Sequence, residues 1–259
     1  MVAIGTRRTA NTLNSEGQTI MKKDLKKDDM TEANMESYIR KIPFLACLHD
    51  TEISEFKRII VKKQFVKDAS ILHEENTSNY FYFIMKGKVK IVQLSAGGKE
   101  KILAIHKKGD FFGEMAILDG KTAPATVIAM EDTLIGLISR DMFDQHLLTN
   151  NRVLREMIIL LCGRLRDAWS MMRVMSFADA EHRVKAVLEG MAEQFGIHGP
   201  GGTLIDIKLT HSDIGNFASL ARETATRMMN RLEKAQEIEI IHHKYILLKP
   251  AFYKKNDIL

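Results

Sequence analysis

The sequence predicts an α+β chain with an antiparallel β-domain, one long helix and a smaller C-terminal domain of helices and a β-ribbon. Three observations predict it. Short alternating or apolar runs fill about residues 64–139, as expected for antiparallel strands. Apolar residues then recur at helical spacing over 151–176. Beyond this segment, two short amphipathic helices precede two alternating runs joined by a turn.

The first segments of the chain are polar and then helical. Residues 1–34 have little to bury, so we expect a mobile extension. Residues 35–62 carry helical spacing in two pieces, with a break near Pro43 and His49–Asp50. They open a β-containing domain that we expect to span 35–150.

Five segments of this domain read as strands. They are separated by turn signals at Gly87, Gly97–Gly98, Gly109 and Gly120. The segments are NYFYFIMKG, KVKIVQL, EKILAIH, ATVIAM and TLIGLIS. SAGG between the second and third predicts a hairpin, because glycine adopts positive φ without Cβ strain. Many short strands at this spacing are typical of a barrel or sandwich.

The segment 151–176 predicts a dimerisation helix. Its apolar residues alternate spacings of four and three, the pattern of a coiled-coil seam. The seam consists of Leu154, Ile158, Leu161, Leu165, Ala168, Met172 and Met175. The alternative is a core helix packed on its own domain. Charged residues on the other faces favour a parallel homodimer.

Composition is that of a globular protein, with 45% hydrophobic and 27% charged residues. No run approaches the roughly 18 apolar residues of a membrane span, and the N-terminus lacks the apolar core of a secretory signal. Two cysteines, Cys47 and Cys162, fit a reducing cytoplasm and are too few for a four-cysteine metal site. We therefore expect a cytoplasmic protein with no membrane partner.

Net charge does not by itself identify a partner. The chain carries +5, which permits an anionic partner without requiring one. We expect the C-terminal domain to span 177–259, with Asp179 as a helix N-cap and hinge. From residue 178 onward, eleven Lys and Arg balance eleven Asp and Glu. Any nucleic-acid binding must therefore rest on how the charges are arranged.

LTHSDIGNFASLARETATRMMNRLEK, residues 209–234, predicts a helix–turn–helix. Thr210 and Asp213 have the spacing of a capping box. Gly215 is small enough for two helices to cross closely, and residues 218–220 supply a three-residue turn. The second helix of such a motif enters the DNA major groove with its N-terminal side chains at the base edges.

The second helix carries side chains suited to reading bases. Arg donates two bonds to guanine, Glu accepts from cytosine, and Thr contacts the thymine methyl. The alternative is a solvated face in which Glu223 and Arg227 form an i,i+4 ion pair. The following ribbon, with a basic turn at 242–244, resembles a wing and favours DNA binding. The expected DNA-contacting residues are Thr210, Arg222, Glu223, Thr224, Thr226, Arg227, Arg231 and Lys244.

Over about residues 36–250 the chain resembles the CRP/FNR family of bacterial transcription regulators. The reader motif of that family, usually S-R-E-T-v-x-R, matches ARETATR at 221–227. Ala221 stands where a capping Ser is frequent, and Ser219 replaces a turn Gly. The resemblance implies a β-roll like a cyclic-nucleotide-binding domain and a winged helix–turn–helix. It also implies a homodimer on a two-fold symmetric DNA operator, with RNA polymerase as a further partner.

GDFFGEMAILDGKTAPATV, residues 109–127, resembles the phosphate-binding cassette of the family's cyclic-nucleotide pocket. By this resemblance Gly113 admits the ligand to the backbone, and Glu114 accepts the ribose hydroxyl. Where the family has Arg-Ser, this chain has Ala123-Pro124, which supply neither charge nor N–H donor. The implied pocket comprises Gly113, Glu114, Met115, Ala116, Ala123, Pro124, Ala125, Thr126, Arg164, Ala168 and Trp169.

The degenerate cassette predicts a sensor that does not respond to cyclic AMP in the usual way. Losing the Arg costs about 2–5 kcal/mol of ligand binding. Ala168 and Trp169 cannot form the purine hydrogen bonds of cyclic-AMP sensors, and Trp169 is either an anchor or a pocket lid. One alternative is a cyclic-nucleotide regulator rescued by Lys121 or Arg164. Another is a haem or other small-ligand sensor, with His73 and His106 as candidate axial ligands. The cofactor is unknown, and none is required.

An enzyme is not expected. The sequence contains no P-loop, no G-x-S-x-G and no H-E-x-x-H. The remaining rival is a regulator that acts through protein contacts with a vestigial C-terminal domain. That reading predicts a disrupted reader face, whereas Arg222, Glu223 and Arg227 are all present.

Overall fold

The computed structural model describes the backbone of residues 11–13, 19–21, 32–95, 97–177, 179–242 and 244–254. The chain forms two compact units, residues 1–92 with 104–160 and residues 93–103 with 161–259. Most of the expected mobile extension, residues 1–34, lies outside the described residues. In its described part, β1 (Asn11–Leu13) pairs antiparallel with β2 (Thr19–Met21).

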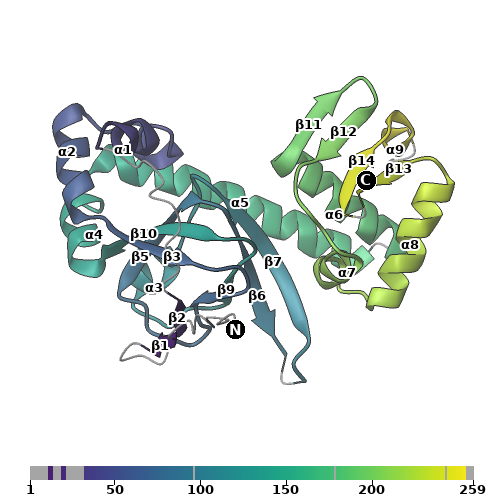
Figure 1. Cartoon of the computed structure of the whole chain (residues 1–259), viewed down its shortest axis with the longest axis horizontal. Coiled ribbons are helices and arrows are strands. Elements are labelled where there is room, and N and C mark those ends of the chain that lie inside the picture. The colour runs from purple at the N-terminus through teal and green to yellow at the C-terminus, as the bar shows by residue number, and fades with distance from the viewer. Residues whose placement is uncertain are drawn as a thin grey trace, which may run out of the picture. The chain divides into compact units, whose positions relative to one another are not determined.

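The first unit has two short helices before its sheets (Figure 1). α1 (Glu32–Ile39) and α2 (Asp50–Ile59) flank a 3-10 turn at Pro43–Leu45, so the predicted break is confirmed. α2 begins with a capping interaction, because the Glu52 carboxylate accepts the backbone N–H of His49 at 2.7 Å.

Two four-stranded antiparallel sheets follow. In the first sheet the strands lie in the order β3 (Val61–Phe65), β10 (Thr133–Ser139), β5 (Tyr80–Lys86) and β8 (Phe111–Phe112) (Figure 1). In the second sheet the order is β4 (Ser70–Leu72), β9 (Thr126–Ala129), β6 (Lys88–Leu94) and β7 (Glu100–Lys107). All five predicted strands are present. Most neighbours in a sheet are distant in sequence, so the pairing is set by long-range packing.

Aromatic side chains fill the core beside these sheets. Phe81 packs against Phe44, Phe111 and Phe143 with ring centroids 4.9–5.7 Å apart, and all four rings are buried. Such pairs stabilise a core beyond the area they bury. α3 (Glu114–Asp119) and α4 (Arg140–His146) are short, and Arg140 Nη2 donates to the Ala116 carbonyl oxygen at 2.8 Å.

The long helix predicted over 151–176 is present as α5 (Asn151–Phe177). The next helix, α6 (Ala180–Phe195), begins at Asp179, whose carboxylate accepts the His182 backbone N–H at 2.9 Å. The predicted N-cap is therefore confirmed. Ala178, within the predicted hinge, lies outside the described residues.

The second unit contains a sheet in the order β11 (Gly196–Gly199), β12 (Gly202–Ile205), β14 (Tyr245–Leu248) and β13 (Ile238–Ile241). With it are α7 (His211–Ala218), α8 (Arg222–Lys234) and α9 (Pro250–Tyr253). The segment GIHGPGG, residues 196–202, reads as a loop in the sequence. This expectation is wrong for 196–199, which pair with β12, and for Gly202, which begins β12. A Cβ on Gly196 would lie 2.1 Å from the Ala192 oxygen, so this glycine permits close packing at the end of α6.

Candidate nucleic-acid interface and effector pocket

The first helix of the predicted helix–turn–helix starts with a capping box. Thr210 Oγ1 accepts the backbone N–H of Asp213 at 3.1 Å, and Asp213 Oδ2 accepts the backbone N–H of Thr210 at 2.8 Å. Two N–H groups that the helix cannot satisfy internally thus have partners. The predicted start of α7 is confirmed.

The turn between α7 and α8 is tight. A Cβ on Gly215 would lie 3.1 Å from the Leu220 oxygen and 3.5 Å from the Ala225 Cβ, so only glycine fits without a shift. Ser219 is left-handed at φ 55°, a modest strain for a residue with a Cβ. Ala221 is the N-cap of α8 without a side-chain hydrogen bond, as its side chain dictates.

α8 buries one face and exposes the other. Its inward residues, Ala225, Met228, Met229 and Leu232, are 0–8% exposed. The outward residues are Arg222, Glu223, Arg227, Asn230 and Arg231. Thr224 and Thr226 are half-exposed between the two faces. The helix therefore presents a polar row that starts at its N-terminus.

Most charged side chains of this polar row form no ion pair with the described residues. Within the described part of the chain, the structure shows no ion pair for Arg222, Glu223 or Arg227, so the alternative Glu223–Arg227 pair is not formed there. Arg231 differs, because its Nη1 lies 2.9 Å from Glu181 Oε2 on α6. Sequence reasoning missed this partner, which lies fifty residues away along the chain.

The predicted wing is present. β13 and β14 pair with Ile241 opposite Tyr245, and the exposed side chain of Lys244 lies at the turn. His243 lies outside the described residues. The Leu209 backbone N–H donates to the Lys244 oxygen at 3.1 Å. This bond ties the wing to the segment that enters α7.

A cavity of about 390 Å³ adjoins the start of α7, the start of α8 and the ribbon. Its apolar lining comprises Leu209, Met229, Ile240 and Ile246. Its polar lining comprises Thr210, His211, Ser212, Arg222 and Lys244. Three of the expected DNA-contacting residues thus border one hollow.

The cassette retains the backbone geometry that the sequence predicts. Gly113 is left-handed at φ 80°, directly before α3, and a Cβ there would lie 2.7 Å from Tyr82 Cδ2. Glu114 is 6% exposed and Ala116 is 1% exposed. Met115, by contrast, is 53% exposed. The inherited turn is therefore intact.

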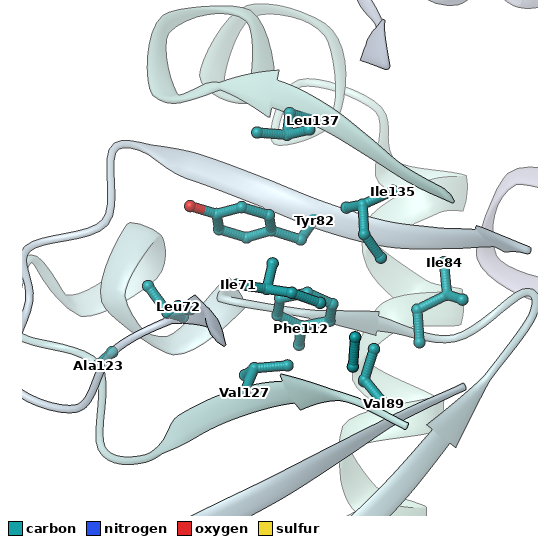
Figure 2. Close-up of a cluster of buried hydrophobic side chains, with 11 residues drawn as sticks. Ile71, Leu72, Tyr82, Ile84, Val89, Phe112, Ala123, Val127, Ile135 and Leu137 are labelled. Carbon is teal, nitrogen blue, oxygen red and sulfur yellow. The ribbon is translucent and has the colours of Figure 1, made fainter. Parts of the chain in front are cut away.

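The second half of the cassette belongs to the hydrophobic core. Ala123 is 2% exposed and lies in an apolar cluster with Leu72, Tyr82, Phe112 and Val127 (Figure 2). Its backbone N–H donates to the Asn76 oxygen at 2.9 Å, and its oxygen accepts from the Glu75 N–H at 2.9 Å. The residue is fixed where the family's arginine would stand.

Two aromatic rings close this cluster. Tyr82 and Phe112 stack with centroids 4.9 Å apart and planes 4° apart, and Figure 2 shows both rings among the apolar side chains. The Ser78 hydroxyl lies 3.3 Å from the Tyr82 hydroxyl. Thr126, 6% exposed, accepts the Glu74 N–H at 3.0 Å. The surroundings of Ala123 are therefore suited to an apolar side chain.

The remaining predicted pocket residues are less enclosed. Pro124 and Lys121 are exposed and Ala125 is buried; the Lys121 backbone N–H donates to Asp119 Oδ1 at 3.0 Å. Arg164 on α5 is half-buried, while Ala168 and Trp169 are exposed, Trp169 by 60%. These three belong to the second unit.

Of the candidate haem ligands, His73 is exposed and His106 is half-buried. His106 Nδ1 lies 3.9 Å from Asp110 Oδ2. Across the described residues, no three His, Cys, Asp or Glu side chains gather where they could hold a metal ion. No helix in the described part of the chain is long and apolar enough to cross a membrane.

An exposed line of mostly apolar residues runs along α5. Ile158, Leu165, Trp169 and Met172 are 49–60% exposed, and Cys162 is exposed between the first two. Their spacings are four, three, four and three, as in a coiled-coil seam. This line shares Ile158, Leu165 and Met172 with the predicted seam. Leu154, Leu161 and Met175 of that seam are half-buried, and Ala168 is exposed.

Two family models match the chain. The cyclic nucleotide-binding domain matches residues 62–150, and the Crp-like helix-turn-helix domain matches residues 182–251. The chain is 26% identical to an anaerobic regulatory protein of Haemophilus influenzae over 80% of this chain and 79% of that protein. It is 28% identical to a cyclic AMP receptor protein of Thermus thermophilus over 71% of this chain and 80% of that protein.

A solved structure agrees with these matches. FixK2 from Bradyrhizobium japonicum superposes with a TM-score of 0.67 at 23% identity, over 76% of this chain and 96% of that one. The α+β fold and the helix–turn–helix predicted from the sequence are thereby confirmed. With both domain models matched in the order that the fold shows, the chain belongs to the CRP/FNR family of transcription regulators.

Proposed function

We propose that this chain is a homodimeric regulator in which α8 reads operator DNA in the major groove. The observation that carries the proposal is the outward row of Arg222, Glu223 and Arg227, which form no ion pair with any residue that the structure describes, above a fully apolar inner face. Guanidinium donors and a carboxylate acceptor on one helix face match the hydrogen-bonding edges of G·C pairs. Thr210, Thr224, Thr226, Arg231 and Lys244 complete the proposed contacts, to phosphates and to base edges.

The proposed dimer is joined along the exposed line of α5. Four apolar side chains that are 49–60% exposed are unusual on a helix that stays in water, and a parallel pair of such helices buries them at seam positions. The two copies of α8 then read two half-sites about one helical turn apart. RNA polymerase is the proposed partner of the DNA-bound dimer.

We further propose that the sensor domain does not respond to cyclic AMP in the usual way. The family's phosphate partner is replaced by Ala123, which lies inside an apolar cluster. An ionised phosphate next to this cluster would lose water without gaining a counter-charge. The backbone turn at Gly113 remains as a feature of the fold.

Two experiments test these proposals. Electrophoretic mobility shift with two-fold palindromes should show a sequence preference that Glu223→Ala relaxes at one base pair of each half-site, by about 1–3 kcal/mol. Glu233→Ala, near the other end of the same helix, is the matched control and should leave the preference unchanged. An unaltered preference in Glu223→Ala refutes the reading role of α8.

Isothermal titration calorimetry tests the sensor. We expect no saturable binding of cyclic AMP or cyclic GMP at micromolar concentrations. Saturable binding would overturn the proposal, and Lys121→Met and Arg164→Met would then show which cation rescues the site. A loss of binding in only one variant would identify that residue.

A further inference from the structure

His211, the first residue of α7, is hydrogen-bonded to the proposed reading helix. Its Nδ1 lies 3.1 Å from Thr226 Oγ1. Both side chains are half-exposed, so solvent reaches them. Thr226 stands one residue before Arg227 on that helix. The imidazole therefore contacts a hydroxyl at the edge of the polar row.

The protonation state of the imidazole decides what this hydroxyl can offer. A neutral ring with its proton on Nε2 accepts the Thr226 proton at Nδ1, so the hydroxyl presents only lone pairs to DNA. An imidazolium donates from both nitrogens. Nδ1–H then donates to Thr226 Oγ1, and the hydroxyl proton is free for an acceptor on a base or phosphate. Histidine side chains change charge between about pH 5 and 8.

The charged groups around His211 favour an anionic partner. His211 borders the 390 Å³ cavity together with Arg222 of α8 and Lys244 of the ribbon. On α7 itself, the Asp213 carboxylate is engaged with the N–H and hydroxyl of Thr210. An imidazolium therefore adds a positive charge beside two existing cations, where a DNA phosphate would approach.

We propose that His211 is a positioning residue that sets the hydrogen-bonding role of Thr226 towards DNA, so that proton uptake both tightens DNA binding and changes the base preference at the Thr226 position. The proposal rests on the proposed DNA-reading function. It goes beyond that function because His211 acts through Thr226 and through its charge, and it makes operator choice depend on pH.

The test uses the full-length protein and duplexes that it selects from a random pool at pH 7. Affinity and base preference are measured at pH 6 and pH 8 at one fixed ionic strength. We expect binding about threefold tighter per half-site at pH 6, and thus about tenfold for the dimer. One base position in each half-site should change its preference.

Three variants separate the roles. His211→Gln, which does not titrate, should lose both effects of pH while still binding the selected DNA. Thr226→Val should keep the gain in affinity and lose the change in preference. His198→Gln is the matched control, because His198 Nδ1 lies 3.0 Å from Thr203 Oγ1 on the β11–β12 hairpin, and both effects should remain.

Each outcome decides the inference. A wild-type pH profile in His211→Gln overturns it, as does a change of preference that persists in Thr226→Val. If His211→Gln fails to fold by circular dichroism, the Thr226→Val result decides alone. A wild-type chain that selects no DNA refutes the proposed function, whereas selection without any pH effect refutes only the role of His211.

Discussion

Replacing Ala123 by arginine tests whether the cassette can still hold a phosphate. Ala123 is 2% exposed among apolar side chains, so an arginine there places a cation in an environment without a counter-charge. Such a group destabilises a fold by several kcal/mol, reduced here because the long side chain can reach towards solvent. We expect Ala123→Arg to lower the free energy of unfolding by about 3 kcal/mol. For a unit of this size, that lowers the melting temperature by roughly 6–12 °C.

A variant without charge separates electrostatics from volume. Ala123→Met introduces a long apolar side chain and should cost about 1 kcal/mol through overpacking. The difference of about 2 kcal/mol then belongs to the charge. Differential scanning fluorimetry, with and without 1 mM cyclic AMP, measures both variants and the wild type.

Cyclic AMP should act on the arginine variant alone. Its phosphate pairs with the new guanidinium, so the melting temperature of Ala123→Arg should rise on adding the nucleotide. The wild-type temperature should not change. Equal losses in Ala123→Arg and Ala123→Met would refute the reasoning, because the site would then tolerate a charge. A rise for the wild type would refute it more directly.

Three further predictions concern Gly215, Cys162 and Asp179. A Cβ on Gly215 would lie 3.1 Å from a backbone oxygen of the turn. Gly215→Val should therefore lower the free energy of unfolding, measured by urea titration, by about 1–3 kcal/mol. A change below about 0.5 kcal/mol would mean that α7 and α8 move apart at little cost. If the exposed line of α5 is the dimer seam, Cys162 meets its own copy, and mild oxidation should give a disulfide-linked dimer on a non-reducing gel. Cys162→Ser should abolish this dimer and Cys47→Ser should not; crosslinking through Cys47 would contradict the seam. The hydrogen bond from the His182 backbone N–H lowers the pKa of the Asp179 carboxyl. The ionised cap therefore stabilises the fold fully above the ordinary aspartate pKa of about 4. This stabilisation is lost as the pH falls through the lowered pKa. Asp179→Ala should therefore cost about 1 kcal/mol at pH 7, and this cost should shrink as the pH falls through the lowered pKa. A cost that does not change between neutral and acid pH would show that the ionised cap is not responsible.

Features fixed by chemistry between near neighbours were predictable from the sequence. The capping box of Thr210 and Asp213 and the N-cap Asp179 each depend on groups within three residues of one another. The strands were also predictable, because alternation marks one buried face. The heptad pattern of α5 identified the helix, whereas the side of the helix that is exposed depends on what packs against it.

Features that join distant segments were not predictable. The order β3-β10-β5-β8 pairs residues as distant in sequence as Val61 and Leu137, and no local pattern fixes such a register. The same holds for Arg231 with Glu181 and for His211 with Thr226. The glycine-rich run at 196–199 reads as a loop because glycine disfavours strands, yet here it makes room for the end of α6.

The outward face of α8 and the cassette differ in the charged residues that they carry, and this difference constrains the chemistry of an effector. α8 carries an outward charged row of Arg222, Glu223 and Arg227, which supports the proposed DNA-binding output. The cassette keeps the turn at Gly113 but has made Ala123 part of a closed apolar cluster. A ligand shifts a conformational equilibrium only by its difference in affinity for the two states. At position 123 a phosphate meets no guanidinium that could generate that difference. Under the proposed function, an effector that acts here gains its affinity without a guanidinium at position 123, so its binding should depend only weakly on ionic strength.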